Sequence, residues 1–280
     1  MTAILTAEGV KFSYPDGTPA LDGVDLLFDA GERVAIVGQN GSGKTTLVRH
    51  FNGLLRPTVG RVLVEGRDAR DRHVAELARS VGLVFQDPDR QIFSGSVRAE
   101  ASFGARNVGL RGEALERAVL HALEIVGLAG ELDTNPYDLG FSRRKLLALA
   151  SVLAMGTAAV VLDEPTTGQD APGVRLVQGI VGALAAEGRT VVAISHDMRF
   201  VAETFERVVV MHEGRVVLDG SPTDVFAQSA WPILRSTHLE PTFPALVGTR
   251  LALGATPTEA VFVDALAALE ARLGPDDQRC

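Results

Sequence analysis

A short glycine-rich loop that ends in a lysine and a threonine is the segment of this sequence best suited to bind phosphate groups. It matches the pattern GxxxxGK[ST] at every fixed position and reads Gly38-Gln39-Asn40-Gly41-Ser42-Gly43-Lys44-Thr45. Glycines let backbone N–H groups wrap closely around phosphate oxygens, and a helix that begins after them adds the positive end of its dipole. Lys44 would reach the β- and γ-phosphates, and the Thr45 hydroxyl would hold Mg²⁺.

The residues that flank this loop supply the strand and the helix that such a site needs. The apolar run Arg33–Val37 precedes it, and Thr46–Arg49 reads as the beginning of a helix. A glycine-rich turn with an accidental lysine is the alternative, and the agreement of the whole loop and both flanks argues against it. The sequence therefore predicts that residues from Gly38 to Thr46 bind a nucleoside triphosphate.

Two adjacent carboxylates follow another apolar run. Asp163 and Glu164 come directly after Val160–Leu162. Asp163, at the end of a buried strand, can orient Mg²⁺ through its water shell, and Glu164 can polarise the water that attacks the γ-phosphate. Such a pair is common after apolar runs, but downstream of a phosphate loop it predicts the catalytic half of the nucleotide site.

Two further polar residues end predicted strands. Gln86 follows Val81–Phe85, and His196 follows Val191–Ser195. Because the carboxyl ends of parallel strands meet at one edge of a sheet, we expect both side chains to lie beside the phosphate loop. A histidine after an apolar strand is by itself more often structural, but this position would let His196 reach the γ-phosphate.

Apolar runs alternate with helical stretches along the chain. Strands are expected in the first 30 residues, around a turn at Pro15-Asp16-Gly17, and at Gly60–Gly66, Val81–Phe85, Ala159–Leu162, Val191–Ile194 and Val208–Met211. Residues 95–129 read as mostly helical. The alternation predicts an α/β fold with a mainly parallel sheet that helices cover on both faces.

An uncharged stretch from Leu146 to Leu162 approaches the length of a membrane span at seventeen residues. Gly156-Thr157 interrupts it, and its second half is β-branched. We therefore expect a buried helix over about Ser142–Met155 and then a buried strand, rather than a transmembrane helix. The N-terminal residues do not predict a signal peptide.

The composition of the 280-residue chain suits one large α/β domain with a small appendage. A formal net charge of −8 argues against a nucleic-acid-binding surface, so no nucleic acid partner is expected. The single cysteine, Cys280, excludes a disulfide framework and a cysteine metal site, which suits a reducing cytosol.

The pattern changes after about Ser229. Trp231-Pro232 and Pro241–Pro244 predict a linker that precedes two helices. The last helix is expected to have Thr256 as its cap, Pro257 at its first position and Glu259 completing a capping box. One face of this helix carries an apolar stripe, which would cover the chain's own core or contact another subunit. The stripe comprises Phe262, Leu266, Leu269 and Leu273.

With these motifs in this order, the chain resembles the ATP-binding subunits of ABC transporters over roughly residues 5–228. The resemblance implies that Tyr14 stacks on adenine, although a half-buried strand tyrosine is the alternative. It also implies that Gln86 is the Q-loop glutamine, which contacts Mg²⁺ and senses a membrane subunit. Asp170 would belong to the D-loop, and His196 would be the switch histidine.

One stretch narrows the resemblance to subunits of the energy-coupling factor type, which serve cobalt and vitamin importers. It is similar to the FQNPDxQ pattern and reads Phe85-Gln86-Asp87-Pro88-Asp89-Arg90-Gln91-Ile92-Phe93. The implied fold is a phosphate-loop NTPase of the ABC ATPase type over residues 1–228, with antiparallel N-terminal strands and a helical subdomain at about 95–155. Residues 229–280 would form a small C-terminal helical extension.

The signature motif of this family, LSGGQ, is altered in this chain. The corresponding segment reads Leu139-Gly140-Phe141-Ser142-Arg143, and only the leucine matches. The motif normally offers a serine hydroxyl, glycine N–H groups and a helix N-terminus to the γ-phosphate bound by the opposite subunit. Gly140 lacks the hydroxyl, and Phe141 is bulky where close approach is needed. Either the motif is impaired, or Ser142 and the basic residues Arg143–Lys145 compensate.

The resemblance implies an ATPase that uses ATP and Mg²⁺. Its catalytic residues would be Lys44, Glu164 and His196, and its metal would be held by Thr45, Gln86 and Asp163. The implied partners are a second ABC ATPase subunit, a transmembrane coupling subunit and a substrate-binding membrane protein, at the cytoplasmic face of the cell membrane. The altered signature favours a different chain with an intact motif as the second ATPase, although a homodimer is the alternative. No residue identifies the transported substrate.

Two other functions compete with this reading of the sequence. One is a soluble ABC-type ATPase that is not tied to transport, and the acidic net charge disfavours its usual nucleic-acid or ribosomal partners. The other is a mainly regulatory ATP-binding subunit of an asymmetric pair. The presence of Glu164 and His196 argues against that role for this chain's own site.

Overall fold

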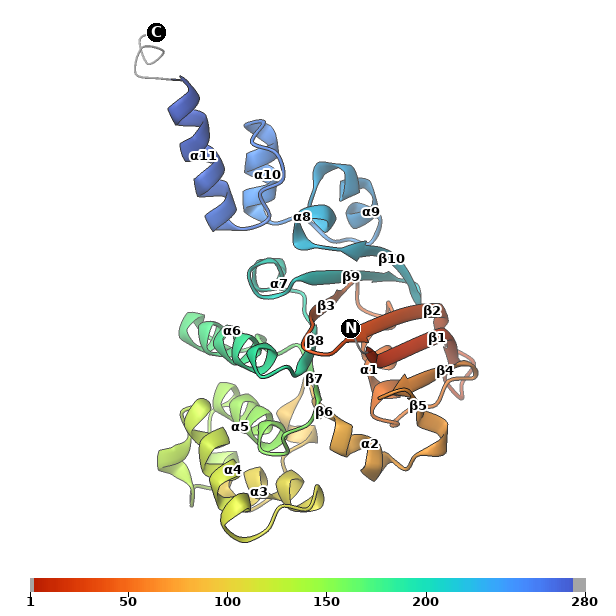
Figure 1. The fold of residues 1–280 in the computed structure, drawn as a ribbon, viewed down its shortest axis with the longest axis vertical. Coiled ribbons are helices and arrows are strands. Elements are labelled where there is room, and N and C mark those ends of the chain that lie inside the picture. The colour runs from red at the N-terminus through yellow and green to blue at the C-terminus, as the bar shows by residue number, and fades with distance from the viewer. Residues whose placement is uncertain (1–2, 274–280) are drawn as a thin grey trace.

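Two β-sheets form the centre of the computed structural model, which describes residues 3–273 (Figure 1). The strands are β1 Ala3–Ser13, β2 Pro19–Asp29, β3 Arg33–Val37, β4 Val59–Val64, β5 Arg67–Asp68, β6 Val81–Val84, β7 Ala159–Asp163, β8 Thr190–Ile194, β9 Arg207–His212 and β10 Arg215–Gly220. The helices are α1 Lys44–Phe51, α2 Val74–Ser80, α3 Val97–Asn107, α4 Gly112–Ile125, α5 Phe141–Leu153, α6 Ala171–Ala186, α7 Met198–Thr204, α8 Pro222–Val225, α9 Trp231–Ser236, α10 Phe243–Arg250 and α11 Glu259–Leu273.

The larger sheet has six strands in the order β10-β9-β3-β8-β7-β6. All neighbours in it are parallel except β10 and β9, so the predicted mainly parallel sheet is confirmed. Strands β7 and β8 are buried at every position, which explains why their sequences are continuous apolar runs instead of alternating ones.

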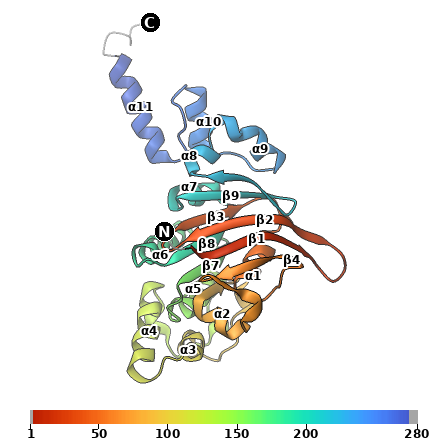
Figure 2. The same ribbon diagram turned by 45° about the vertical axis from the view of Figure 1, so that its right-hand side comes forward.

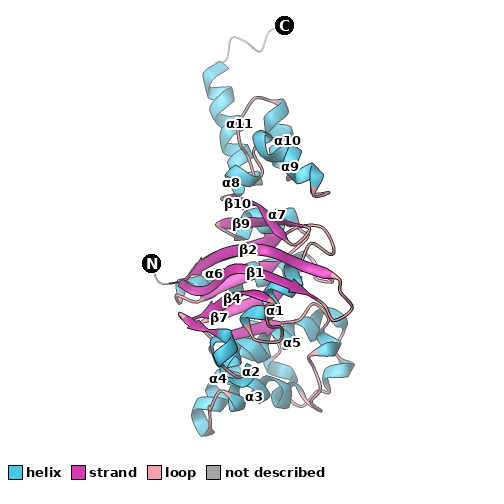
Figure 3. Ribbon diagram, turned by 90° about the vertical axis from the view of Figure 1, so that its right-hand side faces the viewer, coloured by secondary structure: helices cyan, strands magenta, loops and turns pink. Residues whose placement is uncertain are grey.

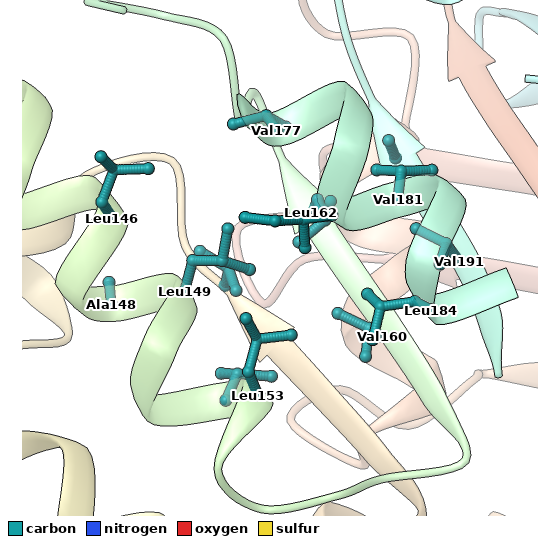
Figure 4. Close-up of a cluster of buried hydrophobic side chains, with 14 of the residues drawn as sticks. Leu146, Ala148, Leu149, Leu153, Val160, Leu162, Val177, Val181, Leu184 and Val191 are labelled. Atoms are coloured by element: carbon teal, nitrogen blue, oxygen red, sulfur yellow. The ribbon is translucent and has the colours of Figure 1, made fainter. Parts of the chain in front are cut away.

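Helices α5 and α6 cover one face of this sheet. Figure 4 shows Leu149 of α5 and Val181 of α6 beside Leu162 of β7, within one hydrophobic cluster. Neighbouring strand residues point to the opposite face, where they meet α1 and the second sheet. On that side Phe51 of α1 packs edge-to-face on Phe28 of β2, with ring centroids 5.5 Å apart.

The smaller sheet is antiparallel and has the order β2-β1-β4-β5. Figure 2 shows β1 and β2 as its two long strands, side by side. The turn predicted at Pro15-Asp16-Gly17 joins them, and the strand predicted at Gly60–Gly66 is β4. The antiparallel N-terminal strands implied by the family resemblance are therefore present.

Helices gather at the two ends of the molecule, above and below the strands in Figure 3. Helices α3, α4 and α5 lie together at one end, and α5 begins and ends within two residues of the predicted limits Ser142 and Met155. Helices α9, α10 and α11 lie at the opposite end. No described helix combines the length and the apolar character needed to cross a bilayer.

The C-terminal part contains the two helices that were predicted, α10 and α11, but the linker before them is partly helical. Helix α9 begins at Trp231, whose indole N–H donates to the Phe226 carbonyl at 3.0 Å, and it buries Leu234. Trp231 and Pro232, which the sequence places in a linker, therefore begin a helix, because proline is well tolerated in the first turn of a helix. The Trp231 hydrogen bond fixes this helix to the preceding segment.

The predicted start of the last helix was wrong. Helix α11 begins at Glu259, and the hydroxyl of Thr258, not of Thr256, accepts the hydrogen bond of the Val261 N–H. The Thr256 hydroxyl does not cap α11 because it donates to the Pro244 carbonyl at 2.7 Å. This hydrogen bond connects α10 to the residues before α11.

The apolar stripe of α11 lies on the less exposed face of the helix. Phe262, Leu266 and Leu269 are half-buried, whereas Val261 and Val263 are exposed. The side chain of Leu273 and residue Cys280 lie outside the described residues.

Replacing Leu162 by alanine should destabilise the protein, because this side chain is 0% exposed in the centre of the larger cluster. We expect a loss of about 2–5 kcal/mol in the free energy of unfolding, measured by denaturant titration. The matched control is Leu27→Ala, at a side chain that is 45% exposed, which should change stability by less than about 0.5 kcal/mol. Equal losses in the two variants would contradict this account of the core.

Candidate nucleotide-binding site

The phosphate loop connects β3 to α1 and closes around the side chain of Lys44. The buried Lys44 ammonium donates to the carbonyls of Gly38 at 2.7 Å and Gln39 at 2.9 Å. Gly38 has a φ of 150°, and a Cβ atom there would lie 2.2 Å from the Met211 carbonyl oxygen, so only glycine fits. Burial lowers the pKa of Lys44, while the charges of Glu164 and Asp163 oppose this change.

The loop forms one wall of a cavity in which most of the predicted site residues meet. The predicted residues that line it are Tyr14, Asn40, Gly41, Gly43, Lys44, Thr45, Thr46, Gln86, Asp163, Glu164 and His196. Gly38, Gln39 and Ser42 belong to the loop without lining the cavity. Thr18, Pro19 and Ala20 also line it and were not predicted. They directly follow the turn after Tyr14, and this proximity is the only signal for them in the sequence.

Two of the three residues that were predicted to hold Mg²⁺, Thr45 and Asp163, contact each other. The Thr45 hydroxyl donates to Asp163 Oδ2 at 3.2 Å, and Gln86 lines the same cavity. Burial raises the pKa of Asp163, while this hydrogen bond and the charges of Arg49, Lys44 and Lys145 oppose the shift. A hydroxyl, a carboxylate and an amide oxygen are the hard oxygen donors that suit Mg²⁺, so this donor set fits the ion.

The Glu164 carboxylate is held on one side only. Its Oε2 atom accepts from the backbone N–H of His196 at 3.3 Å. Its Oε1 atom lies 3.2 Å from His196 Nε2, but the two are not aligned for a hydrogen bond, and Oε1 has no hydrogen-bond partner among the described residues. A buried oxygen without a partner is costly, and a water molecule in the cavity would satisfy it.

Burial sets the protonation of both side chains in this pair. It raises the pKa of Glu164 to about 7, with the negative charge of Asp163 adding to the effect and the His196 N–H opposing it. Burial and the charge of Lys44 lower the pKa of His196. Near neutral pH the carboxylate can therefore accept a proton, and the imidazole is neutral, which is a suitable arrangement for general-base chemistry.

Tyr14, which the family resemblance implies stacks on adenine, lines the cavity. Its hydroxyl is 2.8 Å from Thr46 Oγ1, and its half-buried ring packs edge-to-face on Phe12 with centroids 5.1 Å apart. These contacts fix the ring beside the phosphate loop. The side chain is thus half-buried, directly after the end of β1, and forms part of the cavity wall.

The altered signature segment lies outside this cavity, at the beginning of α5. The Ser142 hydroxyl donates to Gln169 Oε1 at 2.6 Å, Arg143 is paired with Glu131, and Arg144 Nε lies 2.9 Å from Asp89 Oδ1. The side chains that could compensate for the missing serine are thus engaged within the chain. Asp170 also lies outside the cavity and caps α6, where its carboxylate accepts the Gly173 N–H at 2.8 Å.

Comparisons with known proteins agree with this geometry. The family model described as ABC transporter matches residues 21–167. An energy-coupling factor transporter ATP-binding protein, EcfA2 of Symbiobacterium thermophilum, is 46% identical over 230 residues, which cover 80% of each chain. EcfA of Methanothermobacter thermautotrophicus is 39% identical over 245 residues, which cover 87% of this chain and 79% of that protein.

A solved structure gives the same result at the level of the fold. The protein cbiO1 from Clostridium perfringens, described as part of the ABC transporter complex cbiONQ, superposes with a TM-score of 0.75 at 37% identity. The match covers 90% of this chain and 100% of that one. The chain therefore belongs to the family of ATP-binding subunits of ABC transporters and is an ATPase, with relatives of the energy-coupling factor type.

Proposed function

We propose that this chain hydrolyses ATP to drive an importer of the energy-coupling factor type, which takes up a metal ion or a vitamin through membrane partners. The observation that carries this proposal is the meeting of Lys44, Asp163, Glu164 and His196 in one cavity. The relatives named for energy-coupling factor transporters support the type of importer.

The roles of the residues follow from their positions. Lys44 neutralises the β- and γ-phosphates, and the Tyr14 ring forms the wall against which the base of ATP stacks. Glu164 Oε1 accepts a hydrogen bond from the attacking water and takes its proton, while the water oxygen bonds to the γ-phosphorus and the bond to the β-phosphate oxygen breaks. His196 donates to the γ-phosphate and holds Glu164 Oε2 through its backbone. Mg²⁺, held by Thr45, Asp163 and Gln86, would neutralise further phosphate charge.

Replacing Glu164 by glutamine should keep ATP binding but lower hydrolysis by about 10²–10⁴, because the amide cannot take the proton from water. Single-turnover hydrolysis and equilibrium ATP binding, measured on the assembled complex, separate the two effects. Lys44→Ala is the contrasting variant, and it should weaken binding itself since it removes the charge on the phosphates. Unchanged turnover in the glutamine variant would exclude the assigned role of Glu164.

The face that would receive the transmembrane coupling subunit is an apolar groove between α2, β6 and α3. Phe93 and Phe103 line it and are 60% and 47% exposed, with their ring centroids 4.7 Å apart. Gln91, which belongs to the FQNPDxQ-like stretch, also lines the groove. It accepts from the Phe85 N–H at 2.9 Å and donates to the Ala148 carbonyl at 3.2 Å. Gln91 therefore connects this groove to the residue that precedes Gln86 and to helix α5.

Replacing Phe93 by serine should uncouple the chain from its membrane partner while leaving its nucleotide site intact. We expect loss of co-purification with membrane subunits from gently solubilised membranes, with ATP affinity changed less than twofold. Leu27→Ser, at another exposed apolar side chain outside the groove, is the control and should keep the complex together. A Phe93 variant that assembles and transports normally would refute the docking face, and a chain that never co-purifies with membrane proteins would favour a soluble ATPase.

We further propose that the second ATPase is a different chain with an intact signature. In a head-to-tail pair, Gly140–Arg143 would face the partner's ATP, while this chain's own cavity would need the partner's signature. The engagement of Ser142 and Arg143 within the chain supports an impaired motif on this side. One competent site, built on this chain's phosphate loop, and one impaired site would result.

The asymmetry predicts unequal effects of matched substitutions. Glu164→Gln should remove most of the turnover of the complex, whereas the corresponding change in the partner should remove little. Restoring Ser-Gly-Gly-Gln at Gly140–Arg143 should raise turnover at the partner's site only. Equal losses from the two glutamine variants, or full activity of this chain as a homodimer, would rule out the asymmetric pair.

A further inference from the structure

A buried lysine outside the nucleotide cavity reaches the backbone of Glu164. Lys145, in the second turn of α5, is 4% exposed, and its ammonium donates to the main-chain carbonyl oxygen of Glu164. We infer that Lys145 is a positioning residue, which holds the backbone of Glu164 and ties the place of its carboxylate to helix α5. This inference rests on the proposed role of Glu164 in hydrolysis.

The backbone of Glu164 has a conformation that needs such support. Its φ is 52°, in the left-handed region that residues with a Cβ rarely adopt. Its N–H donates to the Ile194 carbonyl of β8 at 2.9 Å, and its carbonyl accepts from Thr167 N–H at 3.3 Å as well as from Lys145. Glu164 is thus bonded to the sheet on one side and to α5 on the other.

The charges around Lys145 favour its role as a donor. The charges of Glu164, Asp163 and Asp87 favour its protonated form, and its ammonium lies 6.0 Å from the centre of the Phe141 ring. Burial lowers its pKa to about 8, so the side chain is mainly protonated near neutral pH. A protonated amine donates a stronger hydrogen bond to a carbonyl than a neutral one does.

Two other contacts join the same end of α5 to the residues after Glu164. The Phe141 ring lies against Gly168, where an added Cβ would be 2.7 Å from the ring carbons. Ser142 and Gln169 exchange two hydrogen bonds, of 2.6 and 3.1 Å. Phe141 and Ser142 are two of the residues that depart from the family signature. The altered signature and Lys145 therefore form one clamp on residues 164–169, and a displacement of α5 by a nucleotide on the partner would move Glu164.

The test is a double-mutant cycle in the assembled complex. Lys145→Met removes the donor and keeps the length of the side chain, and we expect kcat to fall about ten- to hundredfold while the KM for ATP changes less than twofold. Lys145→Arg, which keeps a cationic donor, should restore most of the rate. In a Glu164→Gln background, Lys145→Met should cause no further loss, because the lysine acts only through the glutamate. Lys11→Met, at an exposed lysine, is the matched control and should behave as the wild type.

The outcomes separate this inference from the proposed function. If Glu164→Gln lowers turnover but Lys145→Met does not, the positioning role is refuted and the function stands. A loss from Lys145→Met that multiplies with that of Glu164→Gln, or that arginine does not restore, would show a packing role only and would also refute it. If Glu164→Gln has no effect, the assigned function itself fails. Should the methionine variant not fold, Lys145→Gln gives the same comparison, with an expected rate between those of methionine and arginine.

Discussion

The register of three parallel strands is the constraint on which the site depends. Ile36 of β3 pairs with Ile194 of β8, and Ile194 is also opposite Asp163 of β7. The strands therefore end on one line, and the loops that leave them carry Lys44, Glu164 and His196 to the same edge of the sheet. Because side chains alternate along a strand, a slip of one residue in β7 would turn Asp163 away from Thr45. The close fit of the different apolar side chains packed on the two faces of β7 and β8 opposes such a slip.

Glu164 lies where the edge of the larger sheet meets helix α5. The sheet supplies the carbonyl of Ile194 and the backbone N–H of His196, and both are fixed by strand pairing and by the turn that follows. Helix α5 supplies Lys145 from a separate helical layer. The backbone of Glu164 is held from both sides, so its carboxylate has a defined place in the cavity while Oε1 stays available to water. The chemistry thus depends on contacts from segments that are far apart in the sequence.

Much of this could be predicted from the sequence, because the relevant signals are local. The phosphate loop, the pair Asp163 and Glu164, and the apolar strands are contiguous patterns whose meaning is fixed by short-range geometry. The meeting of Gln86 and His196 with them followed from the rule that parallel strands end at one edge. The contacts of Lys145 and Ser142 could not be predicted, because they depend on how α5 packs against a distant turn. Thr256 failed as a cap for a similar reason, since the Pro244 carbonyl competed for its hydroxyl.

The order of strands in the larger sheet also has a consequence for the synthesis of the protein. β3 needs β8 and β9 as its neighbours, and Ala35 pairs with Ala193. Strand β7 likewise stays without one of its partners until β8 has left the ribosome. During that interval the uncharged stretch from Leu146 to Leu162 is only partly covered, and long-range pairing of this kind forms slowly. The burial that secures the finished site therefore leaves apolar segments of the growing chain exposed until the last strands of the sheet have been made.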